Sequence, residues 1–177
     1  MVYSLSVSGT PCTGKTTNSR KLSSLLKAVY LDLNDYAKSS IGVDYDKDHE
    51  TFDVDVDELG VLFEKEYGSG KEPLVVDGLL SHFMPVSHVL VLRADPRLLS
   101  ARMSERGYGR GKILENLEAE YAGVILYDAL SLHNNVLELD ATTGVDYDVV
   151  SSWLESGGRK VFEKDWSTEF TEALNAL

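Results

Sequence analysis

A chain of 177 residues with 43% hydrophobic and 26% charged residues is long enough to form one domain around a buried core. Its formal net charge of -12 excludes a broad, non-specific grip on nucleic acid, because such binding needs clustered lysine and arginine. A single cysteine excludes an internal disulfide and a cysteine-based zinc site, and is typical of a reducing compartment. With no apolar run near the ~20 residues of a membrane span, and no signal peptide, the sequence predicts a cytoplasmic protein.

Short apolar runs alternate with helical patterns along the chain. Five runs have the length and composition of buried strands, and they cover residues 3–8, 28–33, 73–77, 88–93 and 135–141. Apolar spacing and capping residues predict helices over residues 15–27, 57–67, 95–107, 112–132 and 147–156, with another in the tail at 160–177. Strands that alternate with helices form βαβ units, so the sequence predicts an α/β fold with a mostly parallel sheet.

Between the first strand and the first helix, residues 9–16 read GTPCTGKT and match the phosphate-loop pattern G-x-x-x-x-G-K-[ST] completely. Gly9 and Gly14 let backbone N–H groups point at phosphate oxygens, and the following helix adds its N-terminal dipole. Lys15 is expected to reach the β- and γ-phosphates, and the Thr16 hydroxyl to bind Mg²⁺. A ligand-free glycine-rich turn is the alternative, which the flanking strand and helix patterns disfavour. The residues expected to bind the nucleotide are Gly9, Pro11, Cys12, Thr13, Gly14, Lys15, Thr16, Thr17 and Arg102.

The run at 73–77 ends in Asp77, a carboxylate at the carboxyl end of a buried strand. Ligands of parallel sheets bind at that edge, and phosphate-loop enzymes need an acid there for the Mg²⁺ shell. Asp77 is therefore predicted to hold the metal together with Thr16. The alternative is that it caps a turn before Gly78.

The segment RADPRLLSARMSERGYGRGK concentrates six basic residues against two acids in an otherwise acidic protein. Arg102 and Arg106 lie four residues apart, on one helix face, before a glycine-rich turn that carries Arg110 and Lys112. Phosphoryl transfer crowds anionic oxygens together, and guanidinium groups that close over them neutralise the charge and exclude water. The segment thus favours a transferase with a lid over a hydrolase. A solvated helix face paired with nearby acids is the alternative.

These motifs carry a resemblance to a known family. GTPCTGKTT, NDYAK, VVDG…HFMP, VLRAD and RMSERGY occur in an order and spacing similar to the archaeal and eukaryotic adenylate kinase isoenzyme 6 family, also called coilin-interacting nuclear ATPase proteins, over roughly residues 3–130. The resemblance implies one phosphate-loop kinase domain over 1–177, with a five-stranded parallel sheet, a monophosphate-binding arm at about 34–66 and a short lid at 102–115. It also implies Mg²⁺-dependent adenylate kinase activity with ATP as phosphoryl donor, ATPase activity, and a role in small ribosomal subunit maturation through a ribosomal protein.

The resemblance also assigns residues by position. Lys38 falls where the family has an arginine that grips the monophosphate, and lysine keeps the charge but loses the bidentate fork. Leu79 falls where eukaryotic relatives have a histidine implicated in hydrolysis or transfer. His82 either substitutes for that histidine or is structural. The residues expected to bind substrate are Asp35, Lys38, Arg93, Arg106 and Lys112. The residues expected to act in catalysis are Lys15, Asp77, Arg102 and Arg106.

Two further segments receive an interpretation. Residues 44–66 hold ten acids against two lysines, and these acids either face solvent or present a surface to a basic partner such as a ribosomal protein. Thr142, Thr143 and Gly144 follow the last predicted strand, at the edge where an adenine ring would lie.

The sequence therefore predicts a monomeric kinase that transfers the γ-phosphoryl group of Mg²⁺-ATP to a nucleoside monophosphate, with AMP as the expected acceptor. Two alternatives stay open. One is a ribosome assembly factor, switched by ATP binding and slow hydrolysis, whose kinase turnover is incidental. The other is a phosphate-loop kinase of a different small acceptor.

Overall fold

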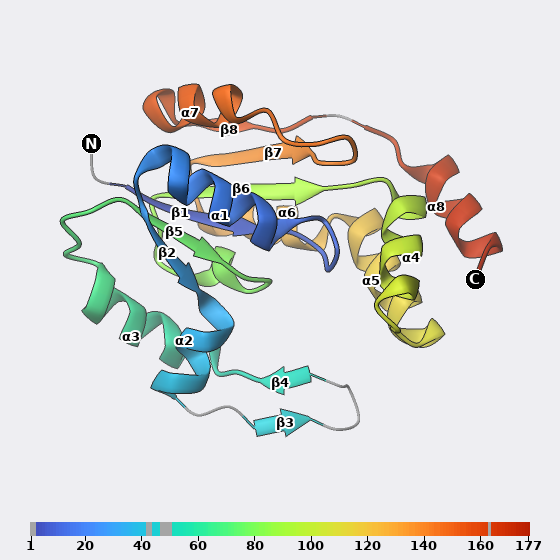
Figure 1. Ribbon diagram of the computed structural model, residues 1–177, viewed down its shortest axis with the longest axis horizontal. Coiled ribbons are helices and arrows are strands. Elements are labelled where there is room, and N and C mark those ends of the chain that lie inside the picture. Colours follow the sequence, from blue (N-terminus) through green and yellow to red (C-terminus); the bar gives the residue numbers. More distant parts are fainter. Residues whose placement is uncertain (1–2, 42–43, 47–50, 163) are drawn as a thin grey trace.

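A six-stranded parallel sheet forms the centre of the computed structural model, in the order β2-β5-β1-β6-β7-β8 (Figure 1). The structure describes residues 3–41, 44–46, 51–162 and 164–177, with the backbone alone for 44–46 and 51–53. The strands are β1 (Ser4–Ser8), β2 (Val29–Asp32), β5 (Leu74–Asp77), β6 (His88–Arg93), β7 (Val136–Asp140) and β8 (Arg159–Lys160). Each neighbouring pair is parallel, so the carboxyl ends of the strands share one edge.

The five predicted strands are confirmed, but the number of strands was wrong. The sixth, β8, has two residues, both exposed, and pairs only with Val136 and Leu137 of β7. A strand this short and polar has no hydrophobic period from which it could be predicted.

Four helices begin where an aspartate accepts hydrogen bonds from backbone N–H groups of the first turn. Asp32, Asp55, Asp95 and Asp146 cap α2, α3, α4 and α7 in this way, and Pro96 follows Asp95 as predicted. The helices are α1 (Lys15–Leu26), α2 (Leu33–Ser40), α3 (Val56–Tyr67), α4 (Pro96–Glu105), α5 (Arg110–Ala122), α6 (Val124–Leu132), α7 (Tyr147–Ser156) and α8 (Ser167–Asn175), with the 3₁₀ turn η1 (Ser81–Phe83). The antiparallel pair β3 (Asp44–Asp46) and β4 (Thr51–Asp53) lies between α2 and α3.

The single helix predicted over 112–132 is wrong. Gly123 has φ of 68° and separates α5 from α6. This left-handed conformation is open to glycine at little cost, and it turns the chain while the apolar spacing continues on both sides. The break directs α5 over the carboxyl edge of the sheet, whereas α6 packs beneath β6 (Figure 1).

The sheet is covered on both faces. Leu5 and Val7 of β1 point to the side of α1 and α7, where Leu22 and Trp153 are fully buried. The opposite side buries Val89 of β6 and neighbouring strand residues against α3, α6 and η1. At about 1.5–3 kcal/mol for each large apolar side chain, these two clusters provide most of the driving force for folding.

A third cluster lies beyond the carboxyl edge of the sheet. It joins α4, α5 and α8 through Met103, Leu117 and Ala173, and it reaches the phosphate loop through the buried side chain of Cys12. Cys12 thus fills space between the loop and the segment predicted as a lid. None of the described helices is long and apolar enough to span a membrane.

Replacement by alanine should have opposite effects on stability at Gly123 and at Gly111, because only Gly123 of the two has a left-handed conformation. Gly123→Ala should lower the free energy of unfolding by about 1–2 kcal/mol, because alanine is strained in the left-handed region. Gly111→Ala in the first turns of α5, where a Cβ meets no atom within 4 Å, should raise it by about 0.5–1 kcal/mol. Urea unfolding measures both, and a stabilised Gly123→Ala variant would contradict the observed break.

Candidate active site

The phosphate loop joins the end of β1 to the first turn of α1. Gly9 has φ of 147°, and a Cβ there would lie 2.3 Å from the Leu92 carbonyl oxygen, so the close approach of loop and β6 requires glycine. The Lys15 ammonium bends back over the loop and donates to the carbonyl oxygens of Gly9 and Thr10 at 2.8 and 3.0 Å. Burial lowers the pKa of Lys15 to about 8, although Asp77, Cys12 and Glu120 act in the opposite direction.

Asp77 lies at the carboxyl end of β5, and only one of its two carboxylate oxygens has a hydrogen-bond partner among the described residues. The Tyr30 hydroxyl donates to Oδ2 at 2.8 Å, and the Arg20 guanidinium stands 5.3 Å from the centre of the Tyr30 ring. Oδ1 is buried and has no hydrogen-bond partner among the described residues. A buried, unpaired carboxylate oxygen requires a cation or a hydrogen-bond donor, so the site fits the Mg²⁺ ion expected here, since Mg²⁺ prefers oxygen ligands. Thr16, the other residue expected to bind the ion, is exposed.

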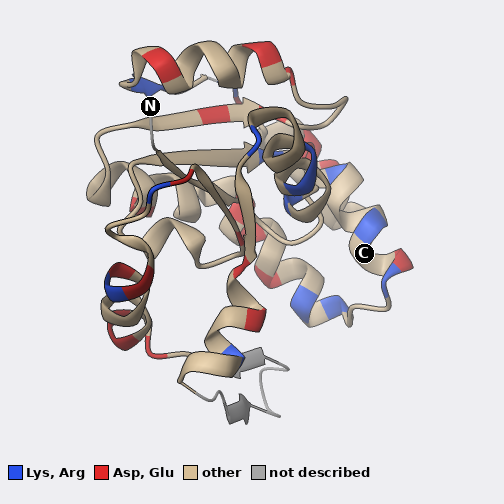
Figure 2. Cartoon of the chain, turned by 60° about the vertical axis from the view of Figure 1, so that its left-hand side comes forward, with Lys and Arg blue, Asp and Glu red and all other residues tan. Residues whose placement is uncertain are grey.

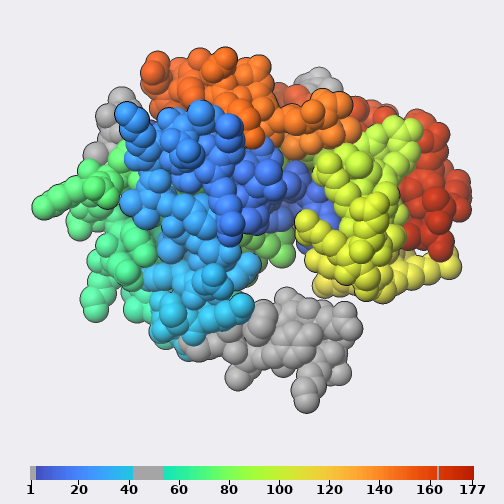
Figure 3. All heavy atoms as spheres, viewed as in Figure 1, coloured from blue at the N-terminus to red at the C-terminus, as the bar shows by residue number. Residues whose placement is uncertain are grey.

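One cavity, of 570 Å³, opens on the α1 side of the loop. Cys12, Thr13 and Gly14 form its floor, and it brings together residues that the sequence predicted separately: Thr17, Arg102, Arg106, Thr142, Thr143 and Gly144. The Arg102 guanidinium donates to the Cys12 carbonyl oxygen at 3.0 Å, which ties α4 to the loop. In Figure 3 the blue atoms of α1 and the preceding loop border the yellow-green atoms of α4.

A second cavity, of 480 Å³, opens on the other side of the same loop. Thr10 and Pro11 form the wall that it shares with the loop, and Lys112 lies on the α5 side. The Lys112 ammonium is 3.1 Å from Glu115 Oε2. Its remaining walls come from the segment after β5, from the turn before α5, and from α5 and α6, and they include Leu79, Leu80, His82, Phe83, Tyr108, Asn116 and Asp128. The loop therefore separates two cavities that are each large enough for part of a nucleotide.

Two of the predicted substrate residues lie on α2, away from both cavities of the described structure. Asp35 is mostly exposed and lines a 510 Å³ hollow beside β2 and α3, and its Oδ1 is 4.0 Å from the Lys38 ammonium. Which ligand they meet stays a prediction.

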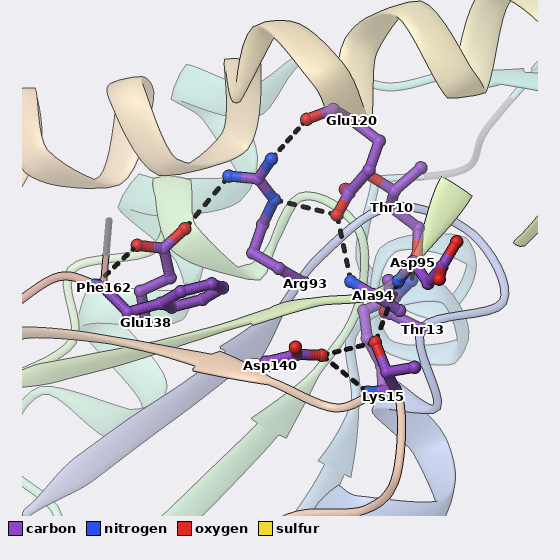
Figure 4. A network of polar contacts seen from close by, with 11 residues as sticks. Thr10, Thr13, Lys15, Arg93, Ala94, Asp95, Glu120, Glu138, Asp140 and Phe162 are labelled. Atoms are coloured by element: carbon purple, nitrogen blue, oxygen red, sulfur yellow. Dashed lines mark hydrogen bonds and ion pairs between the residues drawn. The ribbon is translucent and has the colours of Figure 1, made fainter. Parts of the chain in front are cut away.

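Arg93, which was expected to bind substrate, is buried between two carboxylates. Its side chain is 8% exposed and donates from Nε to Glu120 Oε1 at 2.8 Å and from Nη1 to Glu138 Oε1 at 3.0 Å. Burial raises the pKa of Glu138, although the nearby guanidinium favours the charged carboxylate. These contacts are those of a residue that joins β6 to β7 and α5, and they leave Arg93 outside the two cavities beside the loop (Figure 4).

Glu120 is the residue of this region that sequence reasoning missed. One carboxylate accepts from Arg93 Nε, from the Ala94 backbone N–H at 3.1 Å and from the Thr10 hydroxyl, so it fixes α5 to the end of β6 and to the loop (Figure 4). A signal was available, because Ile113, Leu117 and Glu120 follow helical spacing and place an acid on the buried face of α5.

The acids of the segment 44–66 face solvent where their side chains are described. Asp55, Asp57, Glu58, Glu64 and Glu66 are exposed on or before α3, which fits both a solvated face and a surface for a basic partner, and Figure 2 shows this helix marked by acidic residues. The side chains of the remaining five acids, at positions 44, 46, 48, 50 and 53, lie outside the described residues.

Comparisons with known proteins find relatives that cover nearly the whole chain. Residues 6–123 match the family described as AAA domain. A Pyrococcus furiosus protein named "putative adenylate kinase" is 43% identical over 98% of this chain and 96% of its own length. A protein of the same name from Thermococcus kodakarensis is 42% identical over 98% of both chains, and one from Methanocaldococcus jannaschii is 28% identical over 96% of both.

Solved structures show the same fold at low identity. The crystal structure of a putative kinase from Chloroflexus aurantiacus superposes with a TM-score of 0.51 and 16% identity, covering 89% of this chain and 99% of that one. A Eubacterium ventriosum protein gives 0.54 and 13%, covering 88% and 99%.

The buried hydrogen bonds of Glu120 predict that loss of its charge strongly lowers the stability of the protein. Glu120→Gln should lower the free energy of unfolding by about 3 kcal/mol, because it leaves the buried Arg93 guanidinium with one carboxylate in place of two. Glu118→Gln, on the exposed face of the same helix, should change it by less than about 0.5 kcal/mol. Equal chemical stability of the two variants in urea would show that Glu120 does not hold the loop.

Proposed function

This chain belongs to the family of archaeal proteins named "putative adenylate kinase", a family of phosphate-loop kinases, and on that premise we propose that it transfers the γ-phosphoryl group of ATP to AMP. We propose further that it is a member of the isoenzyme 6 family.

One observation carries the proposal: two cavities meet at one phosphate loop. Cys12 and Thr13 line one cavity, and Thr10 and Pro11 line the other. A hydrolase needs space for one nucleotide and a water molecule, whereas a transferase must hold two substrates with their phosphates facing each other. We assign the donor to the cavity of 570 Å³ and the acceptor to the cavity of 480 Å³.

In this assignment the cations lie where charge develops. Lys15 binds the transferred phosphoryl group, and Arg102 and Arg106 neutralise the donor phosphates from α4 and its end. Asp77 and Thr16 would hold Mg²⁺, which when bound supplies positive charge to the phosphates of ATP. The hydrogen bond from Tyr30 holds Oδ2 of Asp77, which leaves Oδ1 unpaired for the ion.

On the acceptor side, Lys112 is a cation that lines the cavity. We propose that it meets the monophosphate, and that Asp35 and Lys38 approach from α2 when the arm closes over the acceptor. ATPase activity and the link to a basic protein of the small ribosomal subunit are a second proposal, favoured by the exposed acids on α3.

Phosphorus-31 signals distinguish the two proposals. With Mg²⁺-ATP and AMP the protein should form ADP without inorganic phosphate, and Arg106→Ala should slow this transfer by about 100-fold or more, because one preorganised charge is lost from the transition state. Lys160→Ala, which removes an exposed cation from β8, should leave the rate unchanged. Inorganic phosphate alone, formed at a rate indifferent to every monophosphate, would refute the kinase and favour the nucleotide-switched assembly factor.

The position of Lys15 predicts a proton taken up with the nucleotide. With its pKa lowered to about 8, Lys15 is about half protonated at pH 8 in the free protein. Bound phosphates raise that pKa, so binding of ATP should take up about 0.5 proton at pH 8 and about 0.1 at pH 7, and the affinity should fall as the pH rises above 8.

Calorimetric titration in buffers of different ionisation enthalpy measures this uptake. Lys15→Arg is the matched control, since a guanidinium does not titrate in this range and should take up no proton at pH 8. The same uptake in both proteins would assign the proton to another group.

A further inference from the structure

The second cavity brings two hydrogen-bond acceptors close together. His82 of η1 is 2% exposed, and its Nε2 lies 3.9 Å from Oδ2 of Asp128, a residue of α6 that is 34% exposed. Both residues line the cavity. Within the described part of the chain, Nε2 has no hydrogen-bond partner.

The neighbours of the imidazole fix its tautomer. The Ser8 hydroxyl donates its one hydrogen to the Leu79 carbonyl oxygen at 2.9 Å, so it accepts from His82 Nδ1, which lies 2.9 Å away. Nδ1 therefore carries the proton, and Nε2 presents a lone pair. Burial lowers the pKa of His82 to about 4, so the ring is neutral at pH 7 and forms no ion pair with Asp128.

Hydrogen bonds hold the segment that carries His82 in place. Ser81 Oγ lies 2.7 Å from Ser6 Oγ and 2.8 Å from the Gly78 carbonyl oxygen, which docks η1 on the polar face of β1. The His82 carbonyl oxygen accepts from His133 Nε2 at 2.6 Å. The hydrogen bond from Nδ1 to the Ser8 hydroxyl orients the ring on this docked segment and directs Nε2 toward Asp128.

Two acceptors at this separation fit one chemical group. An amino nitrogen can donate one hydrogen to each acceptor from a position about 3 Å from both. A carbonyl oxygen at the same place would face two lone pairs and is rejected, because its own acceptor capacity and those of His82 and Asp128 would stay unsatisfied.

The rest of the cavity fits a planar ring that carries this group. Phe83, whose ring is 4.1 Å from that of His82, and Tyr108 supply aromatic surface, and Leu80 and Ile125 supply apolar surface. Lys112 lies in the same cavity as a cation for the phosphate. Resting on the proposed function, we propose that His82 and Asp128 select the acceptor monophosphate by the exocyclic amino group of its base, favouring adenine and cytosine over hypoxanthine and uracil.

Matched acceptor pairs test the selection. AMP and IMP differ at the amino position, as do CMP and UMP. The kcat/KM of phosphoryl transfer should be about 100-fold higher for the amino member of each pair, because the oxo member leaves the buried His82 Nε2 unpaired and places an oxygen lone pair against the Asp128 carboxylate. Equal kcat/KM within both pairs would overturn the proposal while leaving the kinase intact.

A substitution separates recognition from a structural effect. Asp128→Asn places an amide, which can donate to an oxo group, where the carboxylate stood, so the AMP-to-IMP ratio should fall to less than about tenfold, with an absolute rise in kcat/KM for IMP. Glu118→Gln, an exposed carboxylate-to-amide change on α5, should keep the wild-type ratio. An unchanged ratio in Asp128→Asn would contradict the assignment. His82→Asn removes the ring nitrogen and should also lower the ratio; since His82 is buried, Asp128→Asn decides the matter if this second variant does not fold.

Failure of the proposed function would be seen separately. If no monophosphate accepts a phosphoryl group, equilibrium binding of AMP and IMP to the wild-type protein without ATP still tests the selection. A Kd for AMP at least about tenfold below that for IMP supports it, and equal Kd values overturn it.

Discussion

The arrangement of both cavities depends on the carboxylate of Glu120. It lies inside the protein between α5, the end of β6 and the first residue of the phosphate loop after Gly9, and it accepts a hydrogen bond from each of the last two. Through Arg93 the same network reaches Glu138 on β7, whose second oxygen accepts from the Phe162 backbone N–H. Burying these charges is costly, and only mutual pairing offsets the cost, so α5 cannot move away from the loop without exposing an unpaired charge.

Because Glu120 fixes the phosphate loop, the loop separates the two cavities. Lys15 bends over the loop from its far end, and Arg102 holds the Cys12 carbonyl oxygen on one side, while Lys112 lies across the other side. The three cations thus surround the backbone of the phosphate loop. Phosphoryl transfer needs little covalent chemistry from the protein, and such a distribution of fixed charge about two facing phosphates is the main contribution that a kinase makes.

Local patterns predicted most of the fold, and long-range pairing explains what they missed. The phosphate loop, the five longer strands and the Asp95 cap follow from motif, alternation and capping, which all lie within a few residues. The break at Gly123 was hidden because the apolar spacing continues through it. The hydrogen bond between Thr10 and Glu120 joins residues 110 positions apart, and no single-sequence pattern marks it. The family resemblance assigned Arg93 to the substrate by its position, whereas its burial between two carboxylates is visible only in three dimensions.

The most direct test of the central claim is the binding of one molecule that spans both cavities. Two adenosines joined by five phosphates carry a donor and an acceptor in one chain, so occupation of the first cavity raises the effective concentration of the second end. We expect one bound molecule per protein, a Kd at least about 100-fold below that of ATP, and loss of AMP binding in its presence. Affinity no better than that of ATP, with AMP still able to bind, would show that the two cavities do not form one transfer site.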